Sequence, residues 1–383
     1  MAKDQANGTS NNAGVARIDL HIPPSVTSAT VKIIDIASVN NVPSHALFTP
    51  TVKGIDVHNA PSFCFLIEHP SGQKVLFDLA IRKDWENLSP AITERLKMVG
   101  HRPVVEKNAS ELLDESGVGK ERINAVIWRQ AYSPGHAHWD HTGDMSTFPG
   151  HTDLVVGRGF KEHFLAGDGN SALGGILPSD VEGRAVREIT FEESEVVRIG
   201  QFPAYDYFKD GSMYLLDSPG HCVGHLCALV RTSTSPDTFV FMGGDAAHHC
   251  GEFRPSQYLP LPDTISLQLP QHDRPVPFCP GAWYEDLQTS RNRDPKGPLW
   301  QPSFGHNMEE VMATVGHMQE YDGDDNVFVI LAHDASLRAP NVPMFPDSIN
   351  EWKSRGLGRD LRWTWIGEIL SALEASGGRV PGM

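Results

Sequence analysis

The stretch that decides the fold is His136-Ala137-His138-Trp139-Asp140-His141, six residues that hold three imidazoles and one carboxylate. It follows residues 123–128, an apolar run that is typical of a buried strand. Imidazole and carboxylate are the preferred ligands of zinc and similar ions. With this spacing, the first two histidines can converge on one ion while the aspartate and the last histidine turn toward a second. The alternative is a histidine-rich surface loop, but further candidate ligands downstream argue against it.

Three later stretches carry those further candidates, each beside an apolar strand-like run. They are Ser218-Pro219-Gly220-His221-Cys222-Val223-Gly224-His225, residues 239–245 ending in Asp245, and residues 327–334 containing His333. All four stretches, in this order, resemble the signature of the metallo-β-lactamase superfamily of metallohydrolases, over about residues 30 to 375. Within it, the second loop and the terminal Ala332-His333-Asp334 resemble lactonases of the acyl-homoserine-lactone type, and the chain also resembles fungal lactamase-like hydrolases.

The resemblance implies a fold and a metal centre. The expected fold is an α/β (α+β) protein, an αββα sandwich of two mixed sheets flanked by helices. The expected cofactor is two Zn²⁺ ions per chain, one held by His136, His138 and His221, the other by Asp140, His141 and His333, with Asp245 bridging them. A hydroxide that bridges the metals would attack the substrate, because zinc lowers the pKa of bound water to about 7. Asp140 would be catalytic as well, as the proton shuttle to the leaving group.

Other histidines and cysteines have less clear roles. His225 is expected either to support a ligand or to be an ordinary core histidine. We do not expect ligands at His248, His249, His306, His317, Cys222 or Cys250. Residues 129–135 depart from the family pattern, in which the strand runs almost directly into the histidine loop. Because Pro134-Gly135 cannot extend a strand, this segment is either a bulge that still delivers His136 or a short spurious insertion.

Composition narrows the classes of partner. The chain has 383 residues, 48 Asp and Glu against 32 Lys and Arg, and a formal net charge of −16. No basic cluster accompanies aromatic residues, which argues against nucleic-acid binding. The 5 cysteines are scattered, which fits a reducing compartment. There is no signal-peptide core or stretch of membrane-spanning length, so we expect a cytoplasmic protein without a membrane partner. We expect a small-molecule substrate, and the sequence does not predict the oligomeric state.

We expect a disordered tail at residues 1–29 and one hydrolase domain at residues 30–383, with a proline-rich insertion at about 246–305. Strands are expected near residues 31–36, 62–68, 74–79, 153–157, 196–199, 213–217, 226–230 and 239–242. Helices are expected over 85–99, 109–115, 160–165, 307–321 and 361–373. The insertion is rich in aromatic residues, among them Trp283 and Trp300. It is either a lid that faces the substrate or a structural wrap.

The family does not fix the substrate. The favoured hypothesis is a zinc-dependent hydrolase that opens a small cyclic ester or amide, as a lactonase or lactamase does. The second is a thioester hydrolase, either glyoxalase-like or releasing a polyketide from its carrier protein. A third, of a different class, is a metal-binding fold that serves as a redox or regulatory module. An aromatic-rich lid that closes over a compact ring favours the first hypothesis, and a site left open to a long carrier arm favours the second.

Overall fold

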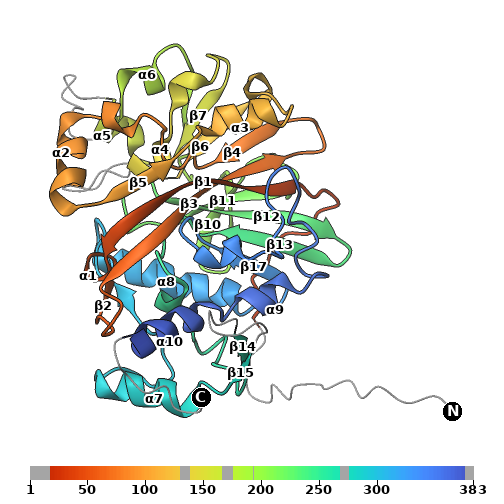
Figure 1. The fold of residues 1–383 in the computed structure, drawn as a ribbon. Helices are drawn as coiled ribbons and strands as arrows, with labels where there is room; N and C mark the ends of the chain where they lie inside the picture. The colour runs from red at the N-terminus through yellow and green to blue at the C-terminus, as the bar shows by residue number, and fades with distance from the viewer. Residues whose placement is uncertain (1–17, 130–138, 166–175, 193, 268–275, 376–383) are drawn as a thin grey trace.

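Two β-sheets lie face to face in the computed structural model, which describes residues 18–129, 139–165, 176–192, 194–267 and 276–375 (Figure 1). The first sheet has seven strands, in the spatial order β5 (Arg102–Val105), β1 (Thr30–Pro43), β3 (Val57–Glu68), β4 (Lys74–Phe77), β6 (Ala125–Trp128), β7 (Asp153–Val156) and β8 (Val186–Glu188). The second has six, in the order β17 (Val327–Ile330), β13 (Asp237–Met242), β12 (Leu226–Thr234), β11 (Met213–Asp217), β10 (Phe202–Asp206) and β9 (Val196–Ile199).

Both sheets are mixed. The pairs β4–β6, β6–β7 and β7–β8 are parallel in the first sheet, and β13–β17 is parallel in the second. The other neighbouring strands are antiparallel, including the predicted hairpin of β3 and β4. Two small sheets pair β14 (Ile265–Leu267) with β15 (Val276–Phe278) and β16 (Gln301–Pro302) with β2 (Phe48–Thr49).

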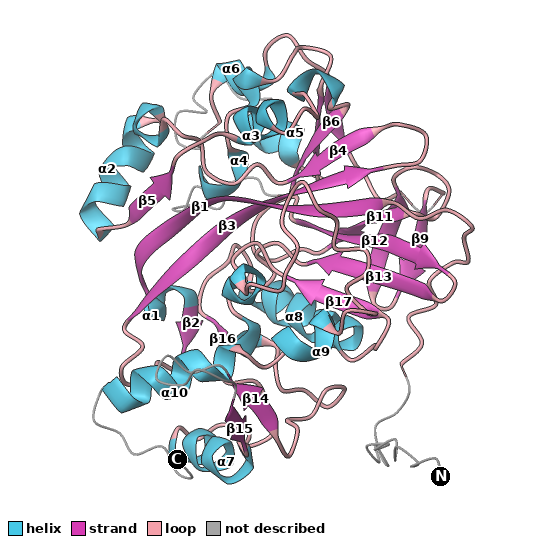
Figure 2. Cartoon of the chain, turned by 45° about the vertical axis from the view of Figure 1, so that its right-hand side comes forward, coloured by secondary structure: helices cyan, strands magenta, loops and turns pink. Residues whose placement is uncertain are grey.

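Helices cover the outer face of each sheet (Figure 2). The helices of the described residues are α1 (Ser44–Leu47), α2 (Pro90–Val99), α3 (Ala109–Glu115), α4 (Trp139–Thr142), α5 (Phe160–Phe164), α6 (Pro178–Val181), α7 (Gly281–Ser290), α8 (Met308–Asp322), α9 (Leu357–Leu361) and α10 (Trp365–Ala375), of which α7 lies beside β14 and β15 and α1 beside β2. In Figure 1, α2, α3, α5 and α6 lie on the side of β4, β6 and β7, whereas α8, α9 and α10 lie on the side of β17.

Alternation along the strands explains the layers. In β3, the side chains of Phe63, Phe65 and Ile67 enter the core between the two sheets, whereas Cys64 and Leu66 enter a second core on the outer face. Successive residues of a strand point to opposite faces, so a strand that is covered on both faces must be apolar at every position. This is why the run from Ala60 to Ile67 is continuously buried and apolar except for Pro61 and Ser62.

The outer cores join each sheet to its helices. Leu96 of α2 and Leu113 of α3 pack on the outer face of the first sheet. Val315 and Met318 of α8 and Ile369 of α10 pack on the outer face of the second. The order helix, sheet, sheet, helix is the predicted αββα sandwich, so the predicted fold class is confirmed.

Two predicted boundaries differ from the structure. The predicted tail, residues 1–29, extends too far, because Leu20 and Ala29 are each only 2% exposed and belong to the cores. The helix predicted over residues 361–373 is divided between α9 and α10. The division has a local cause, because the carbonyl of Arg362 accepts a hydrogen bond from the buried guanidinium of Arg254 instead of closing a helical turn.

The proline-rich segment is largely a structural wrap in its described parts, 246–267 and 276–305. Trp300 is 1% exposed and stacks on Phe48 with ring centroids 4.2 Å apart, which fastens β16 to β2. Trp283 is 9% exposed and packs against Phe278 and Tyr284; it belongs to α7, which lies at the lower end of Figure 1. Both tryptophans are core residues, which argues against the expectation that they contact a substrate.

Candidate metal centre

Parallel pairing of β13 and β17 places two predicted ligands side by side. Met242 is the register partner of Ile330, and Asp245 and His333 each lie three residues beyond that pair. The chain can turn sharply between β13 and the aspartate because Gly244 has a φ of 58°. A Cβ at this glycine would lie 2.5 Å from the guanidinium of Arg129, so a side chain there would displace the arginine.

His221 comes from the loop between β11 and β12. Gly220, which precedes it, has a φ of 117°, and a Cβ there would lie 2.2 Å from the backbone nitrogen of Val311. Only glycine allows the first turn of α8 to approach the loop this closely. The loop is then held by backbone hydrogen bonds from His306 N to the His221 carbonyl and from Asn307 N to the Gly220 carbonyl, at 3.0 and 2.9 Å.

Asp140 and His141 are adjacent residues of the short helix α4. Two backbone contacts fix this helix to the first sheet: Ser62 Oγ donates to the Asp140 carbonyl at 2.9 Å, and Leu79 N donates to the His141 carbonyl at 3.1 Å. His141 is 2% exposed, whereas the side chain of Asp140 keeps 18% of its surface. The helix therefore directs one buried imidazole and one partly accessible carboxylate toward the same point.

The Asp245 carboxylate is at the centre of the cluster. Its Oδ2 lies 3.0 Å from His141 Nε2 and 3.5 Å from His221 Nε2. Its Oδ1 lies 3.3 Å from His333 Nε2. Asp140 Oδ2 closes the group, at 3.6 Å from His141 Nε2 and 3.7 Å from His333 Nε2. Five of the seven predicted ligands are thus brought together, and the other two, His136 and His138, lie outside the described residues.

Charge around Asp245 favours its ionised form. Burial opposes ionisation, but the positive charge of Arg129 and the neighbouring imidazoles of His141, His333 and His248 outweigh burial, so the pKa of Asp245 lies well below its ordinary value. An aspartate that is negative at every physiological pH is suited to share a cation with histidines.

Hydrogen bonds on the far side of two imidazoles decide which nitrogen faces the cluster. His333 Nδ1 donates to the Pro61 carbonyl at 2.6 Å, because a carbonyl can only accept. His141 Nδ1 lies 2.8 Å from Asp78 Oδ2. In both residues Nε2 is then left to face Asp140 and Asp245, the arrangement by which proteins orient metal-binding histidines.

Two residues that the sequence did not single out belong to this cluster. Asp78 follows β4 directly and is 0% exposed; its Oδ1 accepts from Ala80 N at 2.7 Å. Arg129 follows β6 directly and is also 0% exposed. Its Nε donates to Asp78 Oδ2 at 2.6 Å and its Nη2 donates to Asp245 Oδ1 at 3.0 Å. Arg129 is therefore the cation shared by two buried carboxylates beside His141.

The donor atoms fit a metal ion. For a tetrahedral ion with ligand bonds of about 2.0–2.1 Å, neighbouring ligand atoms are about 3.4 Å apart. The separations of 3.0 to 3.7 Å between the imidazole nitrogens and carboxylate oxygens bracket this spacing. Two groups meet the geometry of a cation site among the described residues: Asp140, His141 and His333, and His221, Asp245 and His248.

The remaining histidines separate into two kinds. His225 is 0% exposed, its Nδ1 lies 3.0 Å from the Ser218 carbonyl, and burial lowers its pKa to about 3, so it is a core histidine that closes the loop before β12. His317 on α8 packs edge-on against Phe202. His248, in contrast, was not predicted to be a ligand, yet its Nε2 lies 3.5 Å from Asp245 Oδ2.

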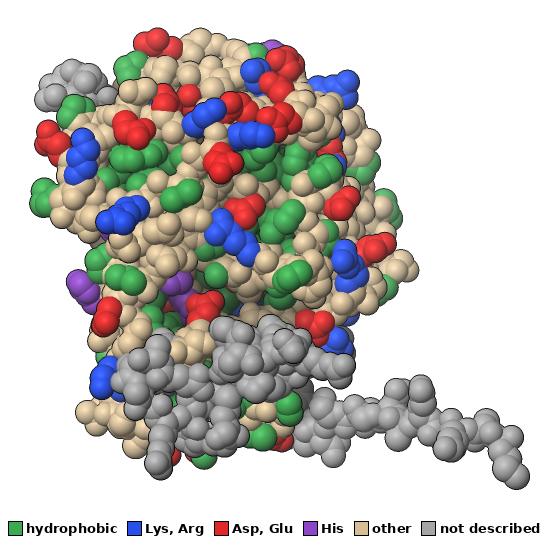
Figure 3. All heavy atoms as spheres, viewed as in Figure 1, with side chains coloured by type: hydrophobic (Ala, Val, Ile, Leu, Met, Phe, Trp, Pro, Cys, Tyr) green, Lys and Arg blue, Asp and Glu red, His purple; other side chains and the backbone are tan. Residues whose placement is uncertain are grey.

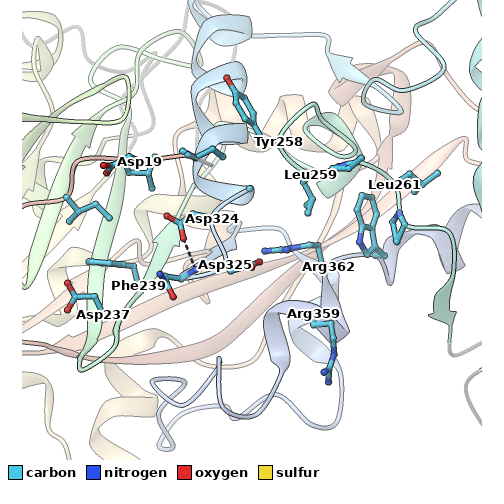
Figure 4. Close-up of a pocket in the computed structure, with 18 of the residues that line it drawn as sticks. Asp19, Asp237, Phe239, Tyr258, Leu259, Leu261, Asp324, Asp325, Arg359 and Arg362 are labelled. Atoms are coloured by element: carbon cyan, nitrogen blue, oxygen red, sulfur yellow. Dashed lines mark hydrogen bonds between the residues drawn. The ribbon is translucent and has the colours of Figure 1, made fainter. Parts of the chain in front are cut away.

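A large cleft lies elsewhere in the molecule. It has a volume of about 1490 Å³ and is lined by residues at the start of β13 and just before β17, among them Asp237, Phe239 and Asp324 (Figure 4). Asp245 and His333 follow the opposite ends of these strands. The cleft is therefore distinct from the metal centre, and the catalytic chemistry cannot be assigned to it.

Surface features add little to the site itself. On the face shown in Figure 3, acidic, basic and apolar side chains are interspersed. Within the described ranges, no helix combines the length and the apolar character that crossing a membrane requires.

The chain is similar to several fungal proteins, although no protein-family model matches it. It is 40% identical over 360 residues to the metallo-hydrolase mfmC of Annulohypoxylon moriforme, covering 92% of this chain and 91% of that protein. It is 38% identical over 358 residues to the gamma-lactamase FDB1 of Fusarium pseudograminearum, covering 91% and 84%. It is also 38% identical over 365 residues to the cytochrome P-450 monooxygenase mpaDE of Penicillium roqueforti, but it spans only 39% of that longer protein.

Solved structures show the same fold. A quorum-quenching N-acyl homoserine lactone hydrolase aligns with 85% of this chain and 100% of its own, with a TM-score of 0.52 and 16% identity. A mutant of Bacillus thuringiensis AiiA with N-decanoyl-L-homoserine bound aligns with 84% and 100%, with a TM-score of 0.53 and 16% identity. Three findings agree on the family of this chain: the fold, the extent of the likeness to mfmC, and the convergence of His141, His221, Asp245 and His333. The chain belongs to the metallo-β-lactamase superfamily of metallohydrolases.

Proposed function

We propose that this chain is a zinc-dependent hydrolase that opens a small cyclic ester or amide, a lactone or a lactam. The observation that carries the proposal is the position of Asp245, whose carboxylate lies 3.0 to 3.5 Å from the imidazoles of His141, His221 and His333. The names of the relatives support the substrate class, because they include a gamma-lactamase and, at lower similarity, N-acyl homoserine lactonases of Rhizobium johnstonii and Agrobacterium fabrum.

The proposed centre holds two ions. Asp140, His141 and His333 would hold one, and His221 would hold the other together with His136 and His138, with Asp245 between them. When bound, zinc lowers the pKa of a coordinated water to about 7 and polarises the substrate carbonyl. Hydrolysis would form a bond from a water oxygen to the carbonyl carbon and would break the ring bond from that carbon to oxygen or nitrogen.

Asp140 is the residue proposed to move the proton. It would accept the proton released by the attacking water and pass it to the ring oxygen or nitrogen that leaves. Its accessibility supports this role, because the Asp140 side chain is 18% exposed whereas that of Asp245 is 3% exposed. A shuttle must reach the substrate, whereas a bridging carboxylate only needs to reach the metals.

A substrate panel on one purified sample tests the proposal. The panel contains an acyl-homoserine lactone, a five-membered lactam and an acyl thioester, assayed with measured zinc content and again after chelation. We expect kcat/KM for the lactone or the lactam to exceed that for the thioester by at least roughly tenfold, about 1.4 kcal/mol in transition-state stabilisation. The net charge of −16 also disfavours docking of an acidic carrier protein.

The outcomes are distinct. Equal or faster turnover of the thioester would move the assignment to a thioester hydrolase. A folded sample that hydrolyses lactone or lactam at full rate after chelation has removed every metal would refute the metal-dependent reaction altogether.

A further inference from the structure

We propose that His248 is an additional ligand of the ion held by His221 and Asp245. The inference rests on the metal centre proposed above, but it goes beyond the family pattern, which assigns no ligand to this position of the chain. His248 Nε2 and His221 Nε2 each lie 3.5 Å from the same oxygen, Asp245 Oδ2. Candidate donor atoms of the three residues all lie within 4.8 Å of one another.

These distances suit a shared cation. With His248 the ion would have five protein donors, and neighbouring donors of a five-coordinate zinc ion with bonds of about 2.0–2.1 Å lie about 2.9–3.6 Å apart. The two nitrogen-to-oxygen separations of 3.5 Å fall within that range. Direct hydrogen bonds from the imidazoles to the carboxylate would be shorter, at about 2.7–2.9 Å for charged partners. All three side chains are at most 7% exposed, so bulk water does not compete for the position.

The polar contacts of His248 with the described residues do not explain its burial. Within those ranges, its Nδ1 has no hydrogen-bond partner, and its Nε2 has the 3.5 Å approach to Asp245. The core histidine His225 differs in that its Nδ1 lies 3.0 Å from the Ser218 carbonyl, although its Nε2 has no partner among the described residues. Leaving a buried polar group unsatisfied destabilises a protein, because the group has lost its hydrogen bonds to water. A metal bond at Nε2 would give this nitrogen a partner closer than the 3.5 Å approach to Asp245.

The ring of His248 is held among groups that belong to the centre. Its centroid lies 5.1 Å from that of His221 and 6.0 Å from that of His333, to which it is nearly parallel at 11°. Phe304 packs against both His221 and His248, at 5.2 and 4.9 Å. The phenyl ring therefore fixes the two imidazoles relative to each other on one side of Asp245.

The backbone of His248 is fixed as well. Glu252 is 1% exposed, and its Oε1 accepts hydrogen bonds from the backbone nitrogens of His248 and His249, at 2.7 and 2.8 Å. The turn is anchored two residues later, where Arg254 forms a two-pronged ion pair with Asp322 at 2.8 and 2.7 Å. A ligand on so constrained a turn loses little conformational freedom when the ion binds.

The test measures metal binding rather than turnover. Wild type and the His248→Ala variant are titrated with Zn²⁺ and with Co²⁺ against a chromogenic chelator, and the visible spectrum of the Co²⁺-loaded protein is recorded. We expect His248→Ala to bind one equivalent of metal at least roughly tenfold more weakly than the wild type does. Tenfold is the smallest loss that is typical when a residue that only orients a metal ligand is removed, so loss of a ligand should cost at least as much. We also expect a changed Co²⁺ spectrum, because a nitrogen donor has been lost.

Two further variants separate ligation from packing. His317→Ala removes a histidine from α8 away from the centre and should bind metal as the wild type does. Glu252→Gln keeps an oxygen acceptor for the two backbone N–H groups and should retain metal, whereas Glu252→Ala should weaken the same equivalent as His248→Ala. If His248→Ala does not fold, the wild-type protein loaded with an NMR-active cadmium isotope provides a second test. A metal bond to His248 predicts measurable coupling between the cadmium and the isotopically labelled ring nitrogen of His248.

An unchanged affinity and Co²⁺ spectrum in His248→Ala would overturn the inference, even if its turnover fell. Absence of metal coupling to the His248 ring, with coupling to His221 present, would overturn it equally. If the wild type binds metal through His248 but hydrolyses no lactone or lactam, the proposed function fails and the ligand assignment stands.

Discussion

Asp78→Asn is expected to weaken metal binding although Asp78 touches no ion. The aspartate uses both oxygens: Oδ1 accepts from Ala80 N at 2.7 Å, and Oδ2 faces Arg129 Nε at 2.6 Å and His141 Nδ1 at 2.8 Å. Asparagine has one oxygen and one NH₂ group, so it cannot serve both sides. Either the backbone N–H of Ala80 or the two side-chain donors must lose their acceptor.

The size of the effect follows from these contacts. Loss of the outer hydrogen-bond partner of a metal-binding histidine costs 10- to 100-fold in metal affinity, about 1.4 to 2.7 kcal/mol. The same substitution leaves Arg129 with Asp245 as its remaining charged partner at 3.0 Å. Breaking one side of a buried ion pair destabilises a protein by about 3–5 kcal/mol, so we expect the metal-free variant to unfold more easily by up to that amount.

The assay pairs chelator competition with urea unfolding, and Asp180→Asn is the matched control. Asp180 is also a buried aspartate, 2% exposed, whose Oδ2 accepts from the backbone nitrogen of Leu177 at 2.8 Å. It belongs to α6, outside the metal centre, so this control should keep wild-type metal affinity. Wild-type affinity in Asp78→Asn would refute the reasoning that Asp78 orients His141.

Three further outcomes are expected. Arg129→Met should destabilise the metal-free protein by about 3–5 kcal/mol, because Asp78 and Asp245 lose their shared cation. Added metal should raise the melting temperature of this variant more than that of the wild type. Equal rises in melting temperature would contradict this prediction. Asp140→Asn should lower kcat more than it alters KM in steady-state assays, and a change confined to KM would remove the shuttle role. Burial raises the pKa of Asp180 from 3.8 to about 6. The free energy of unfolding of the wild type, relative to that of Asp180→Asn, should therefore fall as pH rises from about 4 to 6 and then stay about 3 kcal/mol lower. Urea unfolding that shows no such trend would refute this prediction.

Much of the fold could be predicted because its strands are long or doubly buried. The bounds expected for residues 109–115, 196–199 and 213–217 are those of α3, β9 and β11. What escaped prediction was short or depended on distant contacts. β10 contains a proline and ends in an aspartate, and two of the three residues of β8 are charged, so no apolar alternation stands out in them. The break between α9 and α10 depends on Arg254, 108 residues from the carbonyl of Arg362 that it contacts.

The residues of the metal centre divide in the same way, into those that a sequence motif predicts and those that distant contacts place. His141, His221, Asp245 and His333 could be predicted because each lies in a motif whose order matches the family. Asp78 and Arg129 have no motif of their own and reach the centre through contacts that span 51 and 63 residues. The sequence around His248 does contain a local signal: His248 lies three residues after Asp245 and four before Glu252, and the Glu252 carboxylate accepts a hydrogen bond from its backbone nitrogen in a tight turn after β13.

Parallel strand pairs explain why these scattered residues meet. Asp78 and Arg129 follow the ends of β4 and β6, which are parallel neighbours in the first sheet. Asp245 and His333 follow the ends of β13 and β17, which are parallel neighbours in the second. Parallel neighbours end at the same edge, so two adjacent edges of a packed sandwich deliver four side chains to one point without any long loop. Since the sheets are held by three apolar cores, these positions are set by the fold itself, and a change of loop length before His136 should alter the contribution of that loop while the sheet-borne donors stay in place.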